Sequence, residues 1–266
     1  METRKKILIQ FAHAHVGFQQ AELTSVLDMH GFHLQSLDKD DVKSCSSGDG
    51  KDQTYEVQNI YRVHLPNNDT AENSKLARPF VILSFHQEVP EERITTCLSR
   101  CVLIKSVLEL WGVGNNIYEC AEEVKKLVDS NELACADNGG ACVAGLQRKA
   151  VNHPVQQHCI EGSKSWKLTI YTFGSKYSRE EQSTMRSQFS FLPFTGEVKM
   201  DNPDSEFMLI REVEVDVKGG ALYPRHGPGR TIIEENDQRP PLAIYFGRAI
   251  LGGMRIYLIW IISVCI

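Results

Sequence analysis

The residues best suited to chemistry in this chain are cations gathered between positions 164 and 199. This segment holds six basic side chains against three acidic ones, whereas the whole chain of 266 residues has a formal net charge of −5. Lysine and arginine are the usual contacts of nucleic-acid phosphates, so the pattern predicts a local RNA-binding face on an acidic protein. The alternative, a solvated helix face, stays open. The basic residues are Lys164, Lys167, Lys176, Arg179, Arg186 and Lys199.

The elements that must position these cations are a strand, a helix and a turn. Aromatic and β-branched residues over 166–173 predict a strand. Ser178 and Glu181 have the spacing of a capping box, which predicts a helix from Ser178 to about Phe189. Pro193 prevents the helix from continuing, and the next strand begins near Val198.

The start of this helix is the first candidate for a phosphate contact. Arg179 lies in the first turn, where backbone N–H groups favour an anion, and Lys176 precedes it. Tyr171 and Tyr177 are candidates for stacking on unpaired bases, while Phe173 is more typical of a core.

Residue types that could perform catalysis or bind a metal are present, but their spacing favours neither role. Four histidines flank the ends of predicted elements, a position typical of surface or capping groups. No Cys-x-x-Cys pair occurs among the eight cysteines, and no signal peptide precedes them, so reduced thiols are expected. Cys97, near Arg100, is either an activated thiol or a buried one, and burial is favoured. We therefore predict no catalytic and no metal-binding residues; the histidines are His13, His15, His30 and His33.

The first 112 residues are predicted to form one small α+β domain. The expected order is strand, helix, strand, strand, helix, strand, which is that of a split βαβ, ferredoxin-like unit. A polar loop is expected over 38–53, and Gly112-Val113-Gly114 is interpreted as a hinge between domains. The expected strands are 5–14, 55–65, 79–83 and 102–111, and the helices 18–30 and 90–101.

A second domain is predicted over residues 113–255. Asn115 or Asn116 can cap a helix whose apolar face includes Ile117 and Val124. Residues 131–163 are rich in glycine and poor in charge, and we expect a flexible insertion there. Alternating residues predict a strand or strand pair with one wet face over 201–218, then a loop over 219–241 and a last strand over 242–248.

Three short segments carry a family resemblance: Glu109-Leu110-Trp111-Gly112, Phe191-Leu192-Pro193-Phe194 with the Thr195-Gly196-Glu197-Val198 that follows, and Ile244-Tyr245-Phe246-Gly247-Arg248. In this order they resemble the region before the catalytic domain of Trm11-type tRNA guanosine-10 N2-methyltransferases. That family has a ferredoxin-like domain, a THUMP RNA-binding domain and a Rossmann-type methyltransferase domain.

The resemblance implies an α+β protein that binds tRNA and positions it for S-adenosylmethionine-dependent methylation of guanosine 10. It implies cytoplasmic localisation, and an activating partner subunit that would dock on the methyltransferase domain. It raises the RNA-binding interpretation of six residues, although Arg248 could instead be a domain-interface charge. These residues are Lys167, Lys176, Arg179, Arg186, Lys199 and Arg248.

The catalytic parts of such an enzyme are not recognisable in this sequence. No Asp-Pro-Pro-Tyr-type motif occurs; Pro240-Pro241 lies between Arg239 and Leu242, without a carboxylate. No glycine-rich loop for S-adenosylmethionine follows a strand. We therefore expect a chain that lacks the methyltransferase domain, binds no cofactor itself and is inactive alone.

The last residues, 256–266, are uncharged and apolar. A bilayer-spanning helix needs about 20 apolar residues, so a membrane anchor is not favoured. We expect an aberrant tail from a truncated or mis-spliced reading frame. The alternatives are a membrane-tethered interaction module and a non-functional fragment.

Overall fold

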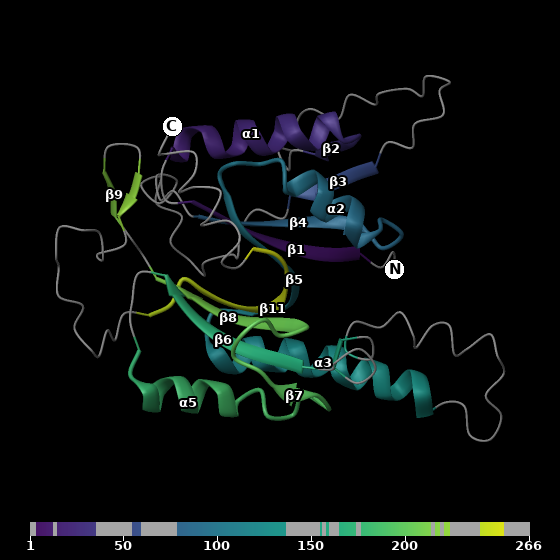
Figure 1. Ribbon diagram of the computed structural model, residues 1–266, viewed down its shortest axis with the longest axis vertical. Helices are drawn as coiled ribbons and strands as arrows, with labels where there is room; N and C mark the ends of the chain where they lie inside the picture. The colour runs from purple at the N-terminus through teal and green to yellow at the C-terminus, as the bar shows by residue number, and fades with distance from the viewer. Residues whose placement is uncertain are drawn as a thin grey trace. The chain divides into compact units, whose positions relative to one another are not determined.

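The computed structural model describes residues 4–12, 15–35, 55–59, 79–136, 155, 158–159, 165–173, 177–213, 216–218, 221–223 and 240–252. The chain forms two compact units, each with its own core (Figure 1). The first consists of Met1–Glu109, Val215–Tyr223 and Ile250–Ile266, and the second of Leu110–Glu214 and Pro224–Ala249.

The first unit has the ferredoxin-like topology predicted from the sequence. Its elements are β1 (Arg4–Phe11), α1 (Val16–Met29), β2 (Phe32–Gln35), β3 (Tyr55–Asn59), β4 (Phe80–His86), α2 (Glu91–Leu98) and β5 (Ile104–Gly114). The strand order is β2-β3-β4-β1-β5, with β1 antiparallel to both β4 and β5 and β3 antiparallel to β4. Strand β2, parallel to β3, was not predicted. A short hairpin of β9 (Asp216–Lys218) and β10 (Ala221–Tyr223) also belongs to this unit.

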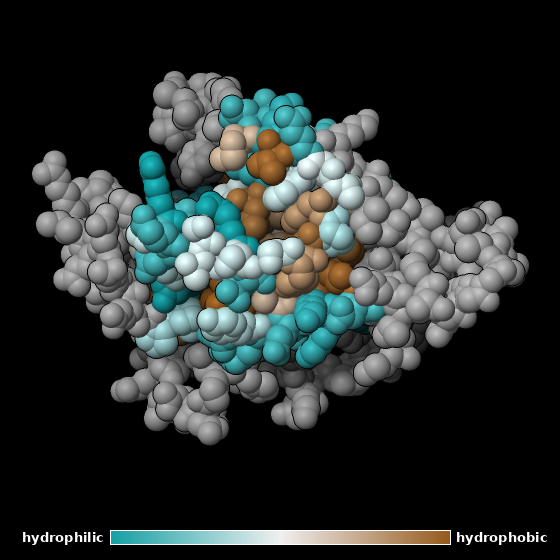
Figure 2. Space-filling view, turned by 90° about the horizontal axis from the view of Figure 1, so that it is seen from below, coloured by the Kyte–Doolittle hydropathy of each residue, from teal (hydrophilic) through white to brown (hydrophobic). Residues whose placement is uncertain are grey.

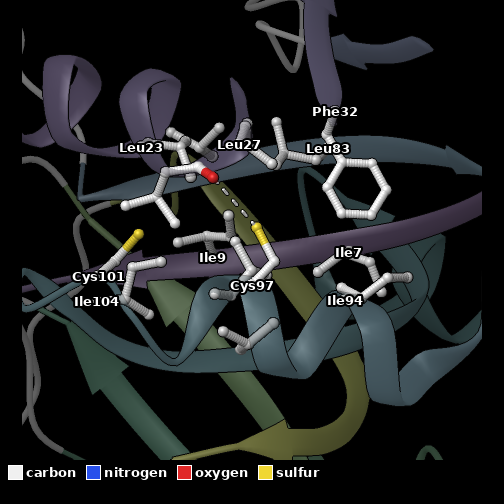
Figure 3. Packing of buried hydrophobic residues seen from close by; sticks show 14 of the residues in the cluster. Ile7, Ile9, Leu23, Leu27, Phe32, Leu83, Ile94, Cys97, Cys101 and Ile104 are labelled. Carbon is white, nitrogen blue, oxygen red and sulfur yellow. Dashed lines mark hydrogen bonds between the residues drawn. The ribbon is translucent and has the colours of Figure 1, made fainter. Parts of the chain in front are cut away.

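One face of this sheet forms the core with both helices. Alternate residues of β1, Ile7, Ile9 and Phe11, are buried in a cluster with residues of α1 and α2 (Figure 3). Cys97 lies within it, where its Sγ donates to the carbonyl oxygen of Val26 at 3.7 Å. Burial raises the pKa of the Cys97 thiol to about 11, although the positive charge of Arg93 opposes the change. The buried-thiol interpretation of Cys97 is therefore confirmed.

The second unit is a mixed sheet in the order β5-β11-β8-β6-β7. Strands β6 and β8 are parallel neighbours, joined through α5, and β11 is antiparallel to β8. Residues of α3 and of the segment after α5 share one core with Phe207 and Leu209 of β8, so both cover the same face of the sheet. Its elements after β5 are α3 (Ile117–Ala136), β6 (Ser165–Phe173), α5 (Arg179–Ser187), β7 (Glu197–Val198), β8 (Ser205–Glu212) and β11 (Ala243–Leu251).

The start of α3 confirms the predicted asparagine cap. The Asn116 Oδ1 accepts the N–H of Glu119 at 3.0 Å, and the Glu119 carboxylate accepts the N–H of Asn115 at 3.0 Å. Gly112–Gly114, interpreted as a hinge between domains, continue β5 and follow closely on the division between the two units at Glu109 and Leu110. A Cβ on Gly112 would lie 2.5 Å from Val124 Cγ2, so this glycine serves the close packing of α3 on the strand.

Three further expectations need correction or fall outside the described residues. Helix α3 continues through 131–136, and Val155 and Cys159 are fully buried in the core, so these positions of the predicted insertion are structured. The wet face predicted for 201–218 is wrong for β8, where Ile210 and Glu212 are buried opposite Phe207 and Leu209. Residues 38–53, 60–65 and 256–266 lie outside the described part. Within the described part, no helix is long and apolar enough to cross a membrane.

Candidate nucleic-acid interface

Helix α5 begins at the residue that the capping box predicted. The Ser178 hydroxyl accepts the N–H of Glu181 at 3.2 Å, and the Glu181 carboxylate accepts the N–H of Ser178 at 2.8 Å. Glu180 and Glu181 both lie in the first turn. Because the box already uses N–H groups and adds a carboxylate, the helix N-terminus itself is a poor phosphate site. Any contact at this corner depends on side chains.

Arg179 and Arg186 lie on the same flank of α5. They are seven residues apart, which is almost two full turns, and both side chains are exposed. Gln182 lies between them and accepts from Arg186 Nη2 at 3.5 Å. We call Arg179 and Arg186 the α5 arginine pair. It is a cationic stripe about 10 Å long on the surface of the second unit.

Both ends of α5 are tied to the sheet by rings. Tyr177, just before the cap, has the Arg211 guanidinium carbon 4.9 Å from its ring centroid. At the other end, Phe189 stacks on Phe246 with ring centroids 4.4 Å apart. Arg211 lies on β8 and only 7% of it is exposed. Sequence reasoning missed Arg211, although its place in the alternating series with Phe207 and Leu209 indicates that it faces the core.

The chain segment between α5 and β7 packs aromatic and aliphatic side chains against the sheet. Trp166 of β6 stacks on Phe194, which in turn lies 4.8 Å from Phe207. Viewed from below, one face of the molecule has hydrophobic residues gathered in its middle and hydrophilic residues around them (Figure 2). Partly buried apolar side chains on the core of this unit include Leu168, Ile170, Met185, Phe191 and Phe194.

Lys167, another predicted RNA contact, does not share a face with the α5 arginine pair. Lys167 lies between Trp166 and Leu168, whose side chains pack on the core, so it points from the opposite face of the sheet. There its Nζ is 3.9 Å from Glu206 Oε1. Lys199 is exposed just after β7, and its N–H donates to the Trp166 carbonyl at 3.0 Å.

Four further positions were candidates for RNA contact, stacking or burial. Arg248 is buried, with 8% of the residue exposed, which disfavours a phosphate contact; the alternative of a domain-interface charge stays a prediction. Phe173 is buried as expected, and Tyr171 is half-buried. Lys176 lies outside the described residues. The RNA-binding roles of all six predicted residues stay predictions.

Comparison with known proteins supports the resemblance seen in the sequence. The family model described as "Tmrp11 THUMP N-terminal domain" matches residues 147–255. The chain is 29% identical over 180 residues to the tRNA (guanine(10)-N(2))-methyltransferase TRMT11 of Bos taurus, covering 66% of this chain and 29% of the relative. It is 22% identical over 253 residues to the Xenopus laevis protein of that name, covering 94% and 36%.

A more distant relative shows the same partial coverage. The tRNA (guanine(10)-N(2))-methyltransferase of Schizosaccharomyces pombe is 19% identical over 227 residues, covering 84% of this chain and 41% of the relative. The chain thus spans less than half the length of the curated relatives that it matches.

Proposed function

We propose that this chain, a Trm11-type protein with a ferredoxin-like and a THUMP-type domain, is a tRNA-binding part of a tRNA (guanine-N2-)-methyltransferase. Bound tRNA would be held so that guanosine 10 reaches a methyltransferase domain that carries S-adenosylmethionine. We assign methyl transfer to the portion of the relatives that lies outside the match, so this chain supplies binding and orientation.

The observation that supports this proposal most directly is the α5 arginine pair. The pair lies within residues 147–255, the region that matches the THUMP family model. Two exposed guanidinium groups on one helix flank can each contact a phosphate of the same RNA strand, through two parallel hydrogen bonds apiece. Since the whole chain carries a net charge of −5, such contacts must be local to bind an anionic partner.

The test is tRNA binding by the full chain over a salt series. R179Q/R186Q removes both guanidinium groups without changing the capping box. A matched control, K125Q/K126Q, removes two exposed lysines from α3 in the same unit. For the wild type we expect the logarithm of affinity to fall linearly with the logarithm of salt concentration.

For R179Q/R186Q we expect weaker binding and a salt slope smaller by roughly 1.4, from about 0.7 per lost contact to a single strand. The control should keep both affinity and slope. An equal loss in the control would show only a general charge effect and would reject this surface. Absence of tRNA binding by the wild type at low salt would reject the function.

The resemblance further implies that the acceptor end of the tRNA is gripped. Binding of intact tRNA is compared with binding of the same tRNA lacking its single-stranded 3′ end. We expect the shortened tRNA to bind more weakly, and equal affinity would exclude an acceptor-end contact.

A further inference from the structure

Helix α5 is held in an unusual way for a surface helix. The structure describes all of its residues; none of their side chains is fully buried, and Met185 packs against the core while staying partly exposed. Most helices are fixed by an apolar stripe packed on a core, because a short isolated helix is only marginally stable in water. The orientation of the α5 arginine pair must therefore depend strongly on contacts at the helix ends.

At the N-terminal end these contacts converge on Tyr177. Gln182, in the second turn of α5, donates from Nε2 to the Tyr177 carbonyl at 3.2 Å. The Arg211 guanidinium carbon lies 4.9 Å from the centroid of the Tyr177 ring. A continuous path thus connects a buried residue of β8 to the helix turn between Arg179 and Arg186.

The guanidinium group of Arg211 is well suited to holding the Tyr177 ring in place. Its position alternates with Phe207 and Leu209, where an apolar side chain would avoid the cost of removing a charge from water. A guanidinium group is planar, always charged and able to lie flat on an aromatic face, whereas a lysine ammonium group lacks this shape. Burial on β8 fixes the guanidinium group, and the ring above it is fixed in turn.

We propose that Arg211 is a positioning residue for RNA binding: by holding the Tyr177 ring it sets the orientation of α5 and of the α5 arginine pair. This inference rests on the proposed function for its consequence, but the contact itself can be tested without RNA.

The first experiment measures hydrogen exchange of the full chain without RNA. Y177L removes the aromatic face, Y177F keeps it, and R211K keeps the charge without the planar group. We expect peptides covering 182–188 to exchange roughly tenfold faster in Y177L and R211K and at the wild-type rate in Y177F. Peptides of β6 and α3 should be unchanged, which separates local release of α5 from general unfolding. An unchanged rate in α5 for Y177L would overturn the inference.

The second experiment measures tRNA affinity and its salt dependence for the same variants. We expect Y177L to bind tRNA roughly fivefold more weakly than the wild type. Its salt slope should be reduced by the same amount as that of R179Q/R186Q. Adding Y177L to R179Q/R186Q should cause no further loss, because both changes remove the same contacts. If Y177L only reduced the fraction of folded protein, the measured affinity would fall but the salt slope would keep its wild-type value.

The outcomes separate the inference from the proposed function. If α5 exchanges faster in Y177L but the wild type binds no tRNA, the positioning contact stands and the proposed function fails. If R179Q/R186Q weakens tRNA binding while Y177L leaves affinity and slope at wild-type values, the positioning role is overturned and the proposed function stands.

Discussion

The indole ring of Trp166 lies nearly parallel to the ring of Phe194, with centroids 4.1 Å apart and an interplanar angle of 16°. Trp166 is on β6, and Phe194 belongs to the segment that returns from α5, so the stack ties this connection back to the sheet. The Trp166 Nε1–H also donates to the Gly196 carbonyl at 2.9 Å. This segment, one of the three that carry the family resemblance, therefore has a packing role.

Replacing Phe194 should reveal the free energy of this stack. F194L keeps an apolar side chain but loses the ring, and we expect the free energy of unfolding to fall by about 1–2 kcal/mol. W166F keeps a ring and loses the bond to Gly196, for an expected loss of about 1 kcal/mol. Urea unfolding of the full chain measures both. The control Y118L replaces a ring that is 65% exposed and should change little, whereas a neutral F194L would contradict the stacking role.

Two glycines should respond in opposite directions to the same substitution. In G112A the new Cβ would lie 2.5 Å from Val124 Cγ2 and 2.7 Å from the Cys120 carbonyl oxygen, which is helix backbone. We expect a loss of about 1–3 kcal/mol in the free energy of unfolding. Gly17 lies in α1, and a Cβ added there would meet no atom of another segment within 4 Å, so G17A should stabilise by up to about 1 kcal/mol. Thermal unfolding compares them, and equal shifts would contradict the close approach of α3.

Four cysteines are buried among the residues that the structure describes, and their thiols should resist alkylation in the native state. Burial raises the pKa of Cys97 to about 11 and of Cys159 to about 12, and it also raises the pKa of Cys120. Burial and the nearby Glu22 carboxylate raise the pKa of Cys101 to about 12. Because the thiolate is the nucleophile, iodoacetamide at pH 8 should modify these four cysteines slowly in native protein and rapidly in urea. Mass spectrometry of the peptides would show it, and native modification at the unfolded rate would reject their burial.

The same thiols should make the protein less stable in alkali. An unfolded thiol loses its proton near pH 9, whereas the folded Cys97 keeps its proton up to about pH 11. In this window the folded state binds more protons, so the free energy of unfolding falls as pH rises. The contribution is at most about 1.4 kcal/mol per pH unit for each thiol. Unfolding of wild type and C97A at pH 8, 9 and 10 isolates it; equal slopes would contradict the raised pKa.

Local signals predicted those elements whose ends depend on local hydrogen bonds. The start of α5 follows from Ser178 and Glu181, and the start of α3 follows from Asn116 and Glu119. Strand β2, only four residues directly after Gly31, is too short for a periodic pattern and exists because β3 pairs with it. Such pairing between distant segments has no local signal.

The candidate site was harder to predict because counting charges along the chain ignores which face they occupy. Lys167 belongs to the same run as Arg179 yet lies across the sheet from the core-facing Trp166 and Leu168. Arg248 follows Ile244 and Phe246 at alternate positions of β11, and the alternation would have indicated burial. Successive side chains of a strand point to opposite faces of the sheet. Applying this alternation to the cations, as well as to the apolar residues, separates surface charges from interior ones.

The capping box offers a second route to the orientation of α5. S178A removes the hydroxyl that accepts the Glu181 N–H, and loss of such a cap costs a helix about 1 kcal/mol. Because no α5 side chain is fully buried, this cost should appear as fraying of α5 and leave global unfolding almost unchanged. We expect faster hydrogen exchange over 180–186 and tRNA affinity reduced severalfold.

Two matched variants make the capping-box result decisive. S178N supplies another capping oxygen without adding a charge beside Arg179, and it should restore both slow exchange and tRNA affinity. S183A removes an exposed serine from the middle of the same helix and should leave both unchanged. Since S178A leaves the Arg211–Tyr177 contact in place, its effect reports helix order independently of the ring. If S178A bound tRNA with wild-type affinity despite faster hydrogen exchange in α5, tRNA binding would not depend on the orientation of the α5 arginine pair.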